Sequence, residues 1–181
     1  MPNSNEPGFV DAHVHIKNID AFAQIAAAGI TAVRDAGLRM DDERRSAAAL
    51  FNKSFAKVIS ARWALYKAGG YGSLFGVPVE TRGEIKAEIL RLKLAGADII
   101  KVMASGMVSL KKPNAVTSGG FNGDELALIV EEARTHDLAV MAHANGEAAI
   151  IAAAEAGVRS IEHGYFMTRR ALDMMAQRKI F

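Results

Sequence analysis

The sequence predicts an α/β fold with parallel strands, because strand-like segments alternate along it with helix-like segments. Three junctions, at 28–33, 95–100 and 156–161, share one pattern: an alanine- or leucine-rich stretch ends in Ala-Gly, and an apolar run follows. Glycine takes the left-handed conformation that commonly ends a helix, so each junction indicates a helix followed by a strand. Strict alternation of this kind favours parallel strands joined by right-handed crossovers.

The predicted elements follow one another in a regular order. We predict strands near 8–15, 30–35, 56–60, 97–104, 138–143 and 158–163, and helices near 18–28, 41–51, 81–95, 124–136, 146–156 and 168–178. Ile180 and Phe181 have the character of a seventh strand that is just beginning. The connections at about 61–80 and 104–123 are rich in Gly, Ser and Asn. Loops of this length in a compact α/β domain usually carry function.

Capping residues support the helix starts. Thr81 and Glu84 fit a capping box ahead of an apolar stripe, and Thr168 is suited to cap the last helix. Either Asn122 or Asp124 caps the helix between them. Acidic residues near the predicted N-termini, at 41–43 and 124–125, suit the helix macrodipole.

Composition excludes several classes of protein. The chain has 181 residues, 50% of them hydrophobic and 23% charged, which argues against disorder. No apolar run approaches the roughly 20 residues of a membrane helix, and the N-terminal segment lacks a signal-peptide core. The net charge is only +2, and no basic patch that could bind nucleic acid stands out in the sequence. The absence of cysteine rules out disulfides and thiolate metal sites. We therefore expect a cytoplasmic protein that binds neither membranes nor nucleic acid.

Four of the five histidines fall at the C-terminal ends of predicted strands: His13, His15, His143 and His163. Ligands and catalytic groups collect at that edge in parallel α/β sheets and barrels. His13 and His15 are separated by one residue on a strand, so their imidazoles point to the same face and are suited to bind a metal. A hydrogen-bonded polar cluster would not explain this placement. His136 is most simply a cation at a helix C-terminus.

Lys101 is a lysine inside an apolar strand, between Ile100 and Val102. A buried ammonium without a partner costs several kcal/mol, so this side chain is paired with a carboxylate, neutral through a lowered pKa, or chemically modified. Because four histidines are predicted at the ends of strands in the same sheet, a role of Lys101 in metal binding is favoured. Glu162 and Asp35 are placed either to orient imidazoles or to make local pairs.

These residues together resemble the metal-dependent amidohydrolase superfamily, in particular its imidazolonepropionase-like and prolidase-like branch. The matching segments are 7–15, 29–35, 100–106, 142–144 and 160–164. Their order and spacing cover nearly the whole chain. The resemblance implies a (β/α)8 TIM-type barrel, of which this chain would hold strands one to six and the start of strand seven.

The resemblance also implies a binuclear centre with two divalent metal ions, usually zinc. His13 and His15 would bind one ion, and His143 and His163 the other. Lys101 would be carboxylated by CO2, and the resulting carbamate would bridge both. Such a centre activates water to hydrolyse amide or peptide-type bonds, as in a dipeptidase or an amidase. The substrate would be a small amide or a dipeptide-like molecule.

Tyr71 stands in Gly69-Gly70-Tyr71-Gly72 where close relatives often have histidine. It contacts substrate, or the glycines simply shape a loop. The catalytic aspartate of the superfamily would lie at the end of strand eight, beyond Phe181. We expect the β-sandwich that flanks the barrel in this superfamily to be absent from this chain. We therefore expect residues 1–181 to form a single barrel domain that is truncated at its C-terminus and associates through its open strand edges. A non-catalytic remnant that keeps the fold and a partial metal site is the alternative.

Overall fold

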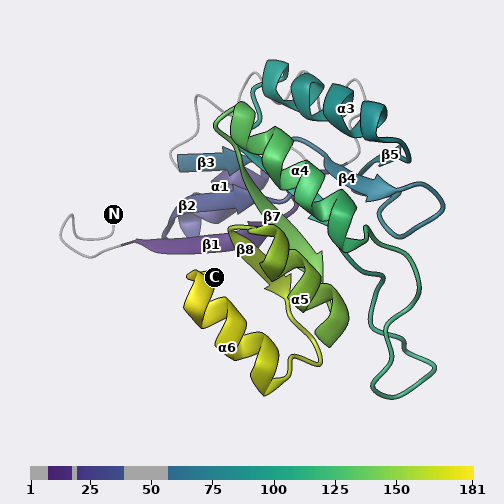
Figure 1. Cartoon of the computed structure of the whole chain (residues 1–181). Helices are drawn as coiled ribbons and strands as arrows, with labels where there is room; N and C mark the ends of the chain where they lie inside the picture. The colour runs from purple at the N-terminus through teal and green to yellow at the C-terminus, as the bar shows by residue number, and fades with distance from the viewer. Residues whose placement is uncertain (1–7, 18–19, 39–56) are drawn as a thin grey trace.

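A computed structural model describes residues 8–17, 20–38 and 57–181 of the chain (Figure 1). The strands are β1 (Phe9–Val14), β2 (Ile30–Asp35), β3 (Lys57–Ser60), β4 (Ala64–Lys67), β5 (Gly76–Val79), β6 (Ile99–Met103), β7 (Ala139–Ala144) and β8 (Ser160–His163). The helices are α1 (Asp20–Ala27), α3 (Arg82–Leu94), α4 (Gly123–Thr135), α5 (Glu147–Ala156) and α6 (Arg169–Arg178). The predicted helix at 41–51, with its acidic start at 41–43, lies outside the described residues.

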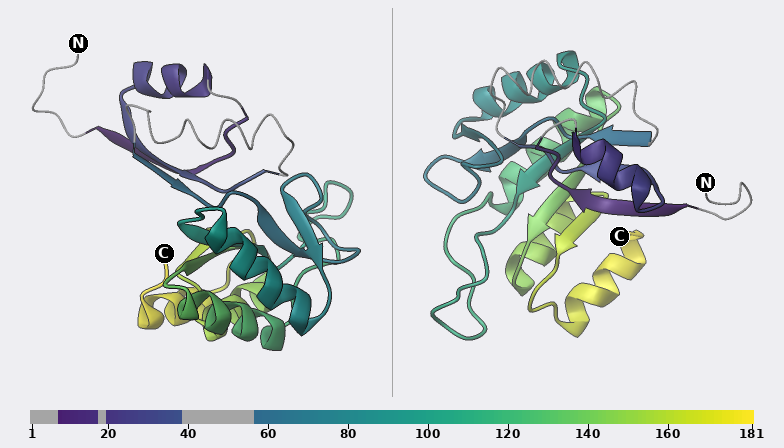
Figure 2. Two further views of the ribbon diagram at one scale, coloured as in Figure 1. Left: turned by 90° about the horizontal axis from the view of Figure 1, so that it is seen from above. Right: turned by 180° about the vertical axis from the view of Figure 1, so that it is seen from behind.

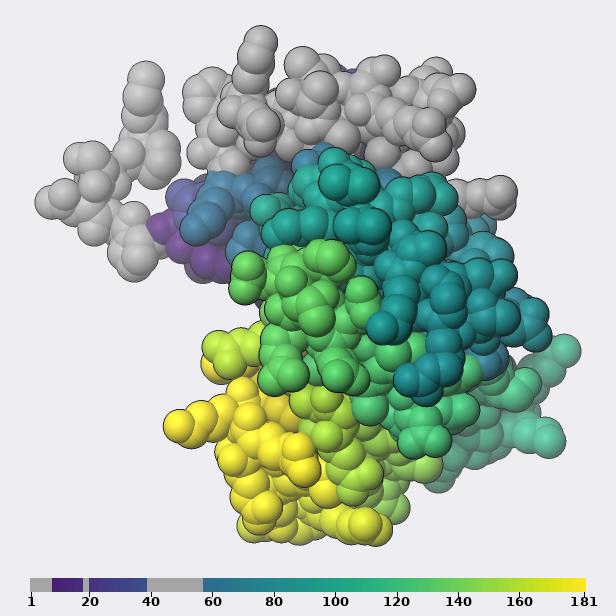
Figure 3. All heavy atoms as spheres, turned by 45° about the horizontal axis from the view of Figure 1, so that its top comes forward, coloured from purple at the N-terminus to yellow at the C-terminus, as the bar shows by residue number. Residues whose placement is uncertain are grey.

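The strands form two parallel sheets. One has the order β1-β2-β3 and the other the order β5-β4-β6-β7-β8. Figure 2 shows α1 against the smaller sheet and the helices from α3 onward against the larger one. In the space-filling view, α3, α4 and the C-terminal segments follow one another across one face (Figure 3). The parallel α/β class predicted from the alternation is confirmed.

The two sheets meet at a sharp bend between β3 and β4. Arg62 has a φ of 61°, in the left-handed region that non-glycine residues rarely adopt. Ser60 bridges the bend, because its carbonyl oxygen accepts from the Asp98 backbone N–H at 2.9 Å and its own N–H donates to the Asp98 carboxylate at 2.9 Å. The six predicted strands therefore lie along one curved arc, with this break directly after the third of them.

The region 61–80, predicted as a loop, contains two strands. Leu65 of β4 pairs with Val77 of β5, and also with Val102 of β6. Each strand has four residues, and β5 contains Pro78, which removes a backbone donor. Proline is tolerated on β5 because this strand is an edge of its sheet. Strands this short, interrupted by glycine and proline, lack the apolar run by which the longer strands were recognised.

The core lies mainly between the larger sheet and its helices. Ile100 and Val102 point from β6 into this layer, where they join buried residues of α3, α4 and α5. Ile99 points to the other face of β6 and packs against Met141 of β7. Alternation along the strand places Lys101 on that same inner face. The inner face of the arc is therefore where the polar residues gather.

The helix ends follow the predicted signals. Thr81 forms the capping box, and Thr168 caps α6 by accepting from Ala171 N–H. Asn122, rather than Asp124, caps α4. His136 is the C-cap of α4, at the helix end predicted for it, and its Nε2 lies 3.6 Å from Glu132 Oε1.

Phe181 continues the larger sheet beyond β8. Its carbonyl oxygen accepts from Ile161 N–H at 2.7 Å, and its own N–H donates to the backbone carbonyl oxygen of Arg159 at 3.2 Å. This pairing is the predicted start of a seventh strand. Within the described residues, no helix is long and apolar enough to span a bilayer.

Candidate metal and substrate site

The four histidines predicted to cluster lie together at one end of the strands. Neighbouring ring centroids are 5.2 Å apart for His15 and His13, 4.9 Å for His13 and His163, and 4.8 Å for His163 and His143. Because β1 and β8 are at opposite ends of the arc, this row of imidazoles shows how strongly the arc curves. Parallel strands explain the arrangement, since their C-terminal ends share one edge.

Glu162 fixes the imidazole of His13. Its Oε2 lies 2.5 Å from His13 Nδ1, while its Oε1 accepts from Arg34 at 2.8 Å and from Ser160 at 2.7 Å. Burial would raise the pKa of Glu162, but the hydrogen bonds from His13 and Ser160 and the charges of Lys101 and Arg34 outweigh it and hold the pKa at about 2. Glu162 is therefore an anion that orients His13, which is one of the two roles predicted for it.

His15 is held by backbone rather than by a carboxylate. Its Nδ1 lies 2.6 Å from the carbonyl oxygen of Gly37. Asp35 accepts from Gly37 N–H at 3.2 Å, from Ile16 N–H at 3.3 Å and from the Ser60 hydroxyl at 3.2 Å. Asp35 thus shapes the turn that orients His15 but does not itself bond to an imidazole. Burial lowers the pKa of His15, which favours its neutral form.

The imidazole of His143 contacts the loop that follows β6. Its Nε2 lies 3.0 Å from the Gly106 carbonyl oxygen and 3.1 Å from Asn145 Nδ2. Burial lowers the pKa of His143 to about 4, so its ring is neutral near pH 7. A neutral ring that donates from Nε2 to Gly106 keeps an electron pair on Nδ1. His13 and His15, which donate from Nδ1, would likewise keep theirs on Nε2.

His163 reaches the cluster through an unusual backbone conformation. Strict alternation along β8 would place it on the face of Ile161, which packs against the helix layer. Its φ of 70° turns the backbone at the end of the strand, and the ring lies beside His13 and His143. A left-handed residue of this size is strained, and such strain is found mostly at functional sites.

Lys101 is the most deeply buried charged residue of the site. It is 1% exposed, and its Nζ has no hydrogen-bond partner within the described ranges. Burial lowers its pKa to about 8, against the opposing effect of Glu162 and together with the repulsion of Arg34. Its charge also affects the pKa values of His15, His143 and His163, so it lies near all three. Among the described residues, no carboxylate forms an ion pair with Lys101, so two of the three states predicted for it remain: a neutral amine and a chemically modified one.

A cavity of about 350 Å³ opens beside the cluster. It is lined by Tyr71, Met107, Val108, Leu110, His143, Asn145, His163 and Tyr165. The Tyr71 ring lies 5.1 Å from that of His143, so Tyr71 contacts the cluster itself. Burial raises the pKa of Tyr71, which keeps its hydroxyl protonated.

The sequence did not identify several residues that support the site. They are Arg34, Phe75, Gly106, Asn145 and Ser160. The Phe75 ring lies 4.6 Å from that of His15, and the side-chain Oδ1 of Asn145 accepts from Tyr165 N–H at 3.1 Å. Arg34, a charged residue in an apolar strand, carried the same signal as Lys101. Gly106 contributes only a backbone oxygen, which leaves no side-chain signal in a sequence.

The described side chains of the cluster do not form a complete metal coordination sphere. Among the described residues, no three His, Asp or Glu side chains converge in a group that could hold an ion. The chemistry of the donors nevertheless fits a metal, because four imidazoles lie close together and each of three has one ring nitrogen fixed by hydrogen bonding. The buried amine of Lys101, which lacks a partner, fits the same centre.

Comparison with known proteins gives one consistent family. A model of the amidohydrolase family matches residues 6–181. The sequence of ochratoxinase from Aspergillus niger is 38% identical over 101 residues, which are 56% of this chain and 20% of that protein. The crystal structure of A. niger ochratoxinase covers 96% of this chain at 25% identity, with a TM-score of 0.74.

Two peptidase structures are also similar. A prolidase in complex with N-methylphosphonate-L-proline is 28% identical, with a TM-score of 0.77 over 97% of this chain. A Xaa-Pro dipeptidase with bound methionine is 25% identical, with a TM-score of 0.78 over 96% of this chain. The chain spans about half the length of these structures, which are matched over 51% to 52%. The described strands therefore form part of an amidohydrolase-type barrel, and the chain belongs to the amidohydrolase family.

Proposed function

We propose that this chain carries the metal site of an enzyme that hydrolyses amide bonds in small, dipeptide-like molecules. One observation supports the proposal most strongly: Lys101 is buried, has no described hydrogen-bond partner and lies near His15, His143 and His163. A buried ammonium group without a partner is unfavourable at this position. An anionic carbamate that binds two metal ions would be stabilised there. Family membership gives the reaction class, and the prolidase and dipeptidase relatives suggest the substrate class.

The ligand set proposed for the centre has two pairs of histidines and one bridge. His13 and His15 would hold one divalent ion through Nε2, because the Nδ1 of each is taken by Glu162 and by Gly37. His143 and His163 would hold the other ion. Imidazole and carboxylate oxygen suit zinc well, so we propose zinc at both positions.

Carboxylation would convert Lys101 into the bridging ligand. The neutral Nζ attacks the carbon of CO2, a C–N bond forms, one C=O bond opens to an oxygen anion, and one proton leaves to solvent. The pKa of about 8 supports this step, since burial enlarges the neutral fraction that acts as the nucleophile. The product carries a negative charge, which the nearby Arg34 would favour.

When bound, the metal pair would supply a water of lowered pKa and polarise the scissile carbonyl. The residues of the chain have other tasks. Glu162 and Gly37 hold the rings of His13 and His15 in place. Tyr71 keeps its proton and faces the cavity beside His143, where it could donate a hydrogen bond to a bound amide.

Hydrolysis of an amide by zinc-loaded protein tests the proposal. Dipeptides of the Xaa-Pro type and N-acyl amino acids are suitable substrates, with Lys101→Met as the matched inactive variant. Turnover by the wild type alone would support the proposal. Zinc binding without turnover, on this chain and on one extended through a further strand–helix pair, would instead indicate a non-catalytic remnant.

We also propose self-association through the edge of β1. Phe9 is 72% and Val10 68% exposed on this strand, and unpaired edges of this kind tend to pair with another chain. Size-exclusion chromatography coupled to light scattering tests this, and a stable monomer at micromolar concentration would contradict it. The cytoplasmic location stays a prediction from the sequence.

A further inference from the structure

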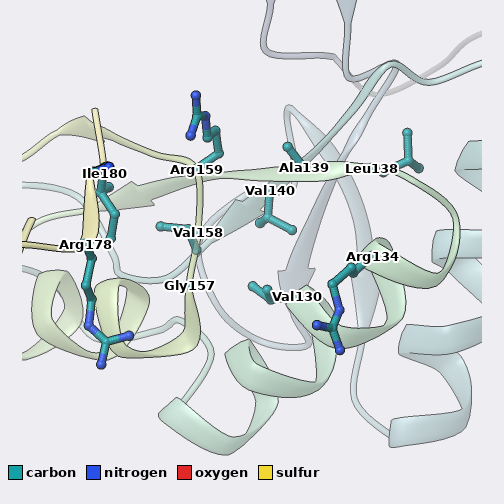
Figure 4. Close-up of a pocket in the computed structure, with 11 residues that line it drawn as sticks. Val130, Arg134, Leu138, Ala139, Val140, Gly157, Val158, Arg159, Arg178 and Ile180 are labelled. Atoms are coloured by element: carbon teal, nitrogen blue, oxygen red, sulfur yellow. The ribbon is translucent and has the colours of Figure 1, made fainter.

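A second cavity lies at the opposite end of the strands (Figure 4). It has a volume of about 400 Å³ and is formed where β7 and β8 begin, between the last turns of α4 and α6. Val140, in its floor, precedes His143 by three residues on β7, which corresponds to about 10 Å along the strand. The cavity is thus separate from the histidine cluster and from the cavity beside Tyr71.

The floor of this cavity is apolar and its rim is basic. Val140 and Val158 are 3% and 2% exposed and form the floor. Arg134, Arg178 and Lys179 are exposed and line the rim. Figure 4 shows the guanidinium groups of Arg134 and Arg178 extending to the same side, with apolar side chains between them. Such a site offers both charge and a surface for an apolar group.

The rim cations have no counterions in the described part of the chain. None of Arg134, Arg178 and Lys179 forms an ion pair there, although other surface cations such as Lys86 and Arg169 do. Arg178 donates one hydrogen bond, to a backbone carbonyl oxygen at 3.3 Å, and keeps its other donors. Its planar group can bind a carboxylate or a phosphate through two parallel hydrogen bonds.

Arg159 also lines the cavity but has a different partner. Its guanidinium lies 4.9 Å from the ring centroid of Phe181. In Figure 4 it extends away from Arg134 and Arg178. The rim that could bind an anion is therefore made by the other three cations.

The helix termini explain only part of this charge. Arg134 and Arg178 are in the last turns of α4 and α6, where cations offset a dipole of roughly half a negative charge per helix. Three full positive charges exceed that requirement. Lys179 has a φ of 55°, at a position where α5 is followed by glycine. Lysine is strained there and glycine would not be, which favours a use for its charge.

We propose that this cavity binds a small organic anion, with its carboxylate or phosphate on the rim that Arg134, Arg178 and Lys179 line and its apolar part on Val140 and Val158. The proposal does not depend on the hydrolytic function. A cavity of this volume is large enough for a molecule with one ring. Phosphate esters and carboxylates share the chemistry that the rim recognises.

Titration of the chain with three anions at constant ionic strength tests the proposal. Inorganic phosphate, phenyl phosphate and phenylacetate are added, and binding is followed by calorimetry and by amide chemical shifts. We expect saturable binding of at least one ring-bearing anion, about tenfold tighter than inorganic phosphate because of the apolar floor. Preference for phenyl phosphate would indicate a phosphate ester as the natural ligand, and preference for phenylacetate a carboxylate.

Arg134→Gln and Arg178→Gln are each expected to weaken this binding about tenfold. Arg170→Gln is the matched control, because it removes the same charge from the other end of α6, about 12 Å away along the helix. Weak, non-saturating responses to all three anions would overturn the proposal. Equal binding by wild type, Arg134→Gln and Arg178→Gln would do so as well, and a lower melting temperature without a change in binding would assign these arginines to the helix dipole.

Discussion

His13 and Glu162 join the two ends of the strand arc through a contact of 2.5 Å between Nδ1 and Oε2, across 149 residues of sequence. The contact involves the most acidic carboxyl group of the site, whose pKa is held at about 2. It orients one proposed metal ligand and at the same time ties β1 to β8. The site and the curvature of the fold therefore depend on the same side chains.

Glu162→Gln should weaken zinc binding, because a neutral amide orients His13 less firmly than a carboxylate does. Loss of such a supporting partner typically costs about 10- to 100-fold in metal affinity. Competition titration with a zinc chelator measures the change. Glu131→Gln, on the exposed face of α4, removes the same charge far from the site and should bind zinc as the wild type does. Equal affinity of both variants would contradict the role given to Glu162.

The metal-free chain should become more stable as the pH rises from about 8 to about 10.5. The folded state holds the pKa of Lys101 at about 8, below its ordinary value of 10.5, so the unfolded chain binds more protons in this window. The full difference corresponds to roughly 3 kcal/mol. Urea unfolding of CO2-free protein at several pH values measures it. Lys101→Met should lack this increase, and an identical increase in the variant would assign it to other groups.

Gly76→Ala should destabilise the chain by more than about 2 kcal/mol, because a Cβ there would lie 1.7 Å from the Ala64 carbonyl oxygen. This contact belongs to the pairing of β4 with β5. Gly123→Ala is the control, since a Cβ at the start of α4 would have no neighbour within 4 Å. Its effect should stay within about 1 kcal/mol and favour folding. Similar unfolding free energies for the two variants would show that β4 and β5 do not pair as described.

Tyr71→Phe should reduce the kcat/KM of amide hydrolysis about tenfold while zinc affinity stays unchanged. Tyr71 lines the cavity and its hydroxyl group keeps its proton, whereas the ring would still pack against His143 after the substitution. Steady-state kinetics and zinc titration on the same preparation separate the two effects. A drop in zinc affinity would make Tyr71 a support for the imidazoles instead of a substrate contact.

Much of the fold could be predicted because its signals are local. The glycines that end α1, α3 and α5 and the caps Thr81 and Thr168 fix element boundaries within a few residues. β4 and β5 could not be found in this way. Their stability comes from pairing with β6 and with each other, which depends on residues distant in sequence.

The residues of the site could be predicted better than the backbone geometry and the hydrogen bonds that orient them. Strand ends and the i, i+2 spacing brought His13 and His15 together, and an apolar strand revealed Lys101. The turn of His163 toward the cluster depends on a left-handed φ that periodicity cannot show. The carbonyl oxygens of Gly37 and Gly106 orient two imidazoles, and a backbone atom carries no residue-type signal.

The state of the Lys101 side chain tests the central claim most directly. The chain is incubated with zinc and 13C-labelled bicarbonate, and its 13C spectrum is recorded beside that of Lys101→Met, with zinc content measured on both. We predict one protein-bound carbamate carbon and about two zinc ions in the wild type, and loss of the carbamate and most of the zinc in the variant. A wild type without a carbamate signal, or a Lys101→Met variant that retains all its zinc, would contradict the account.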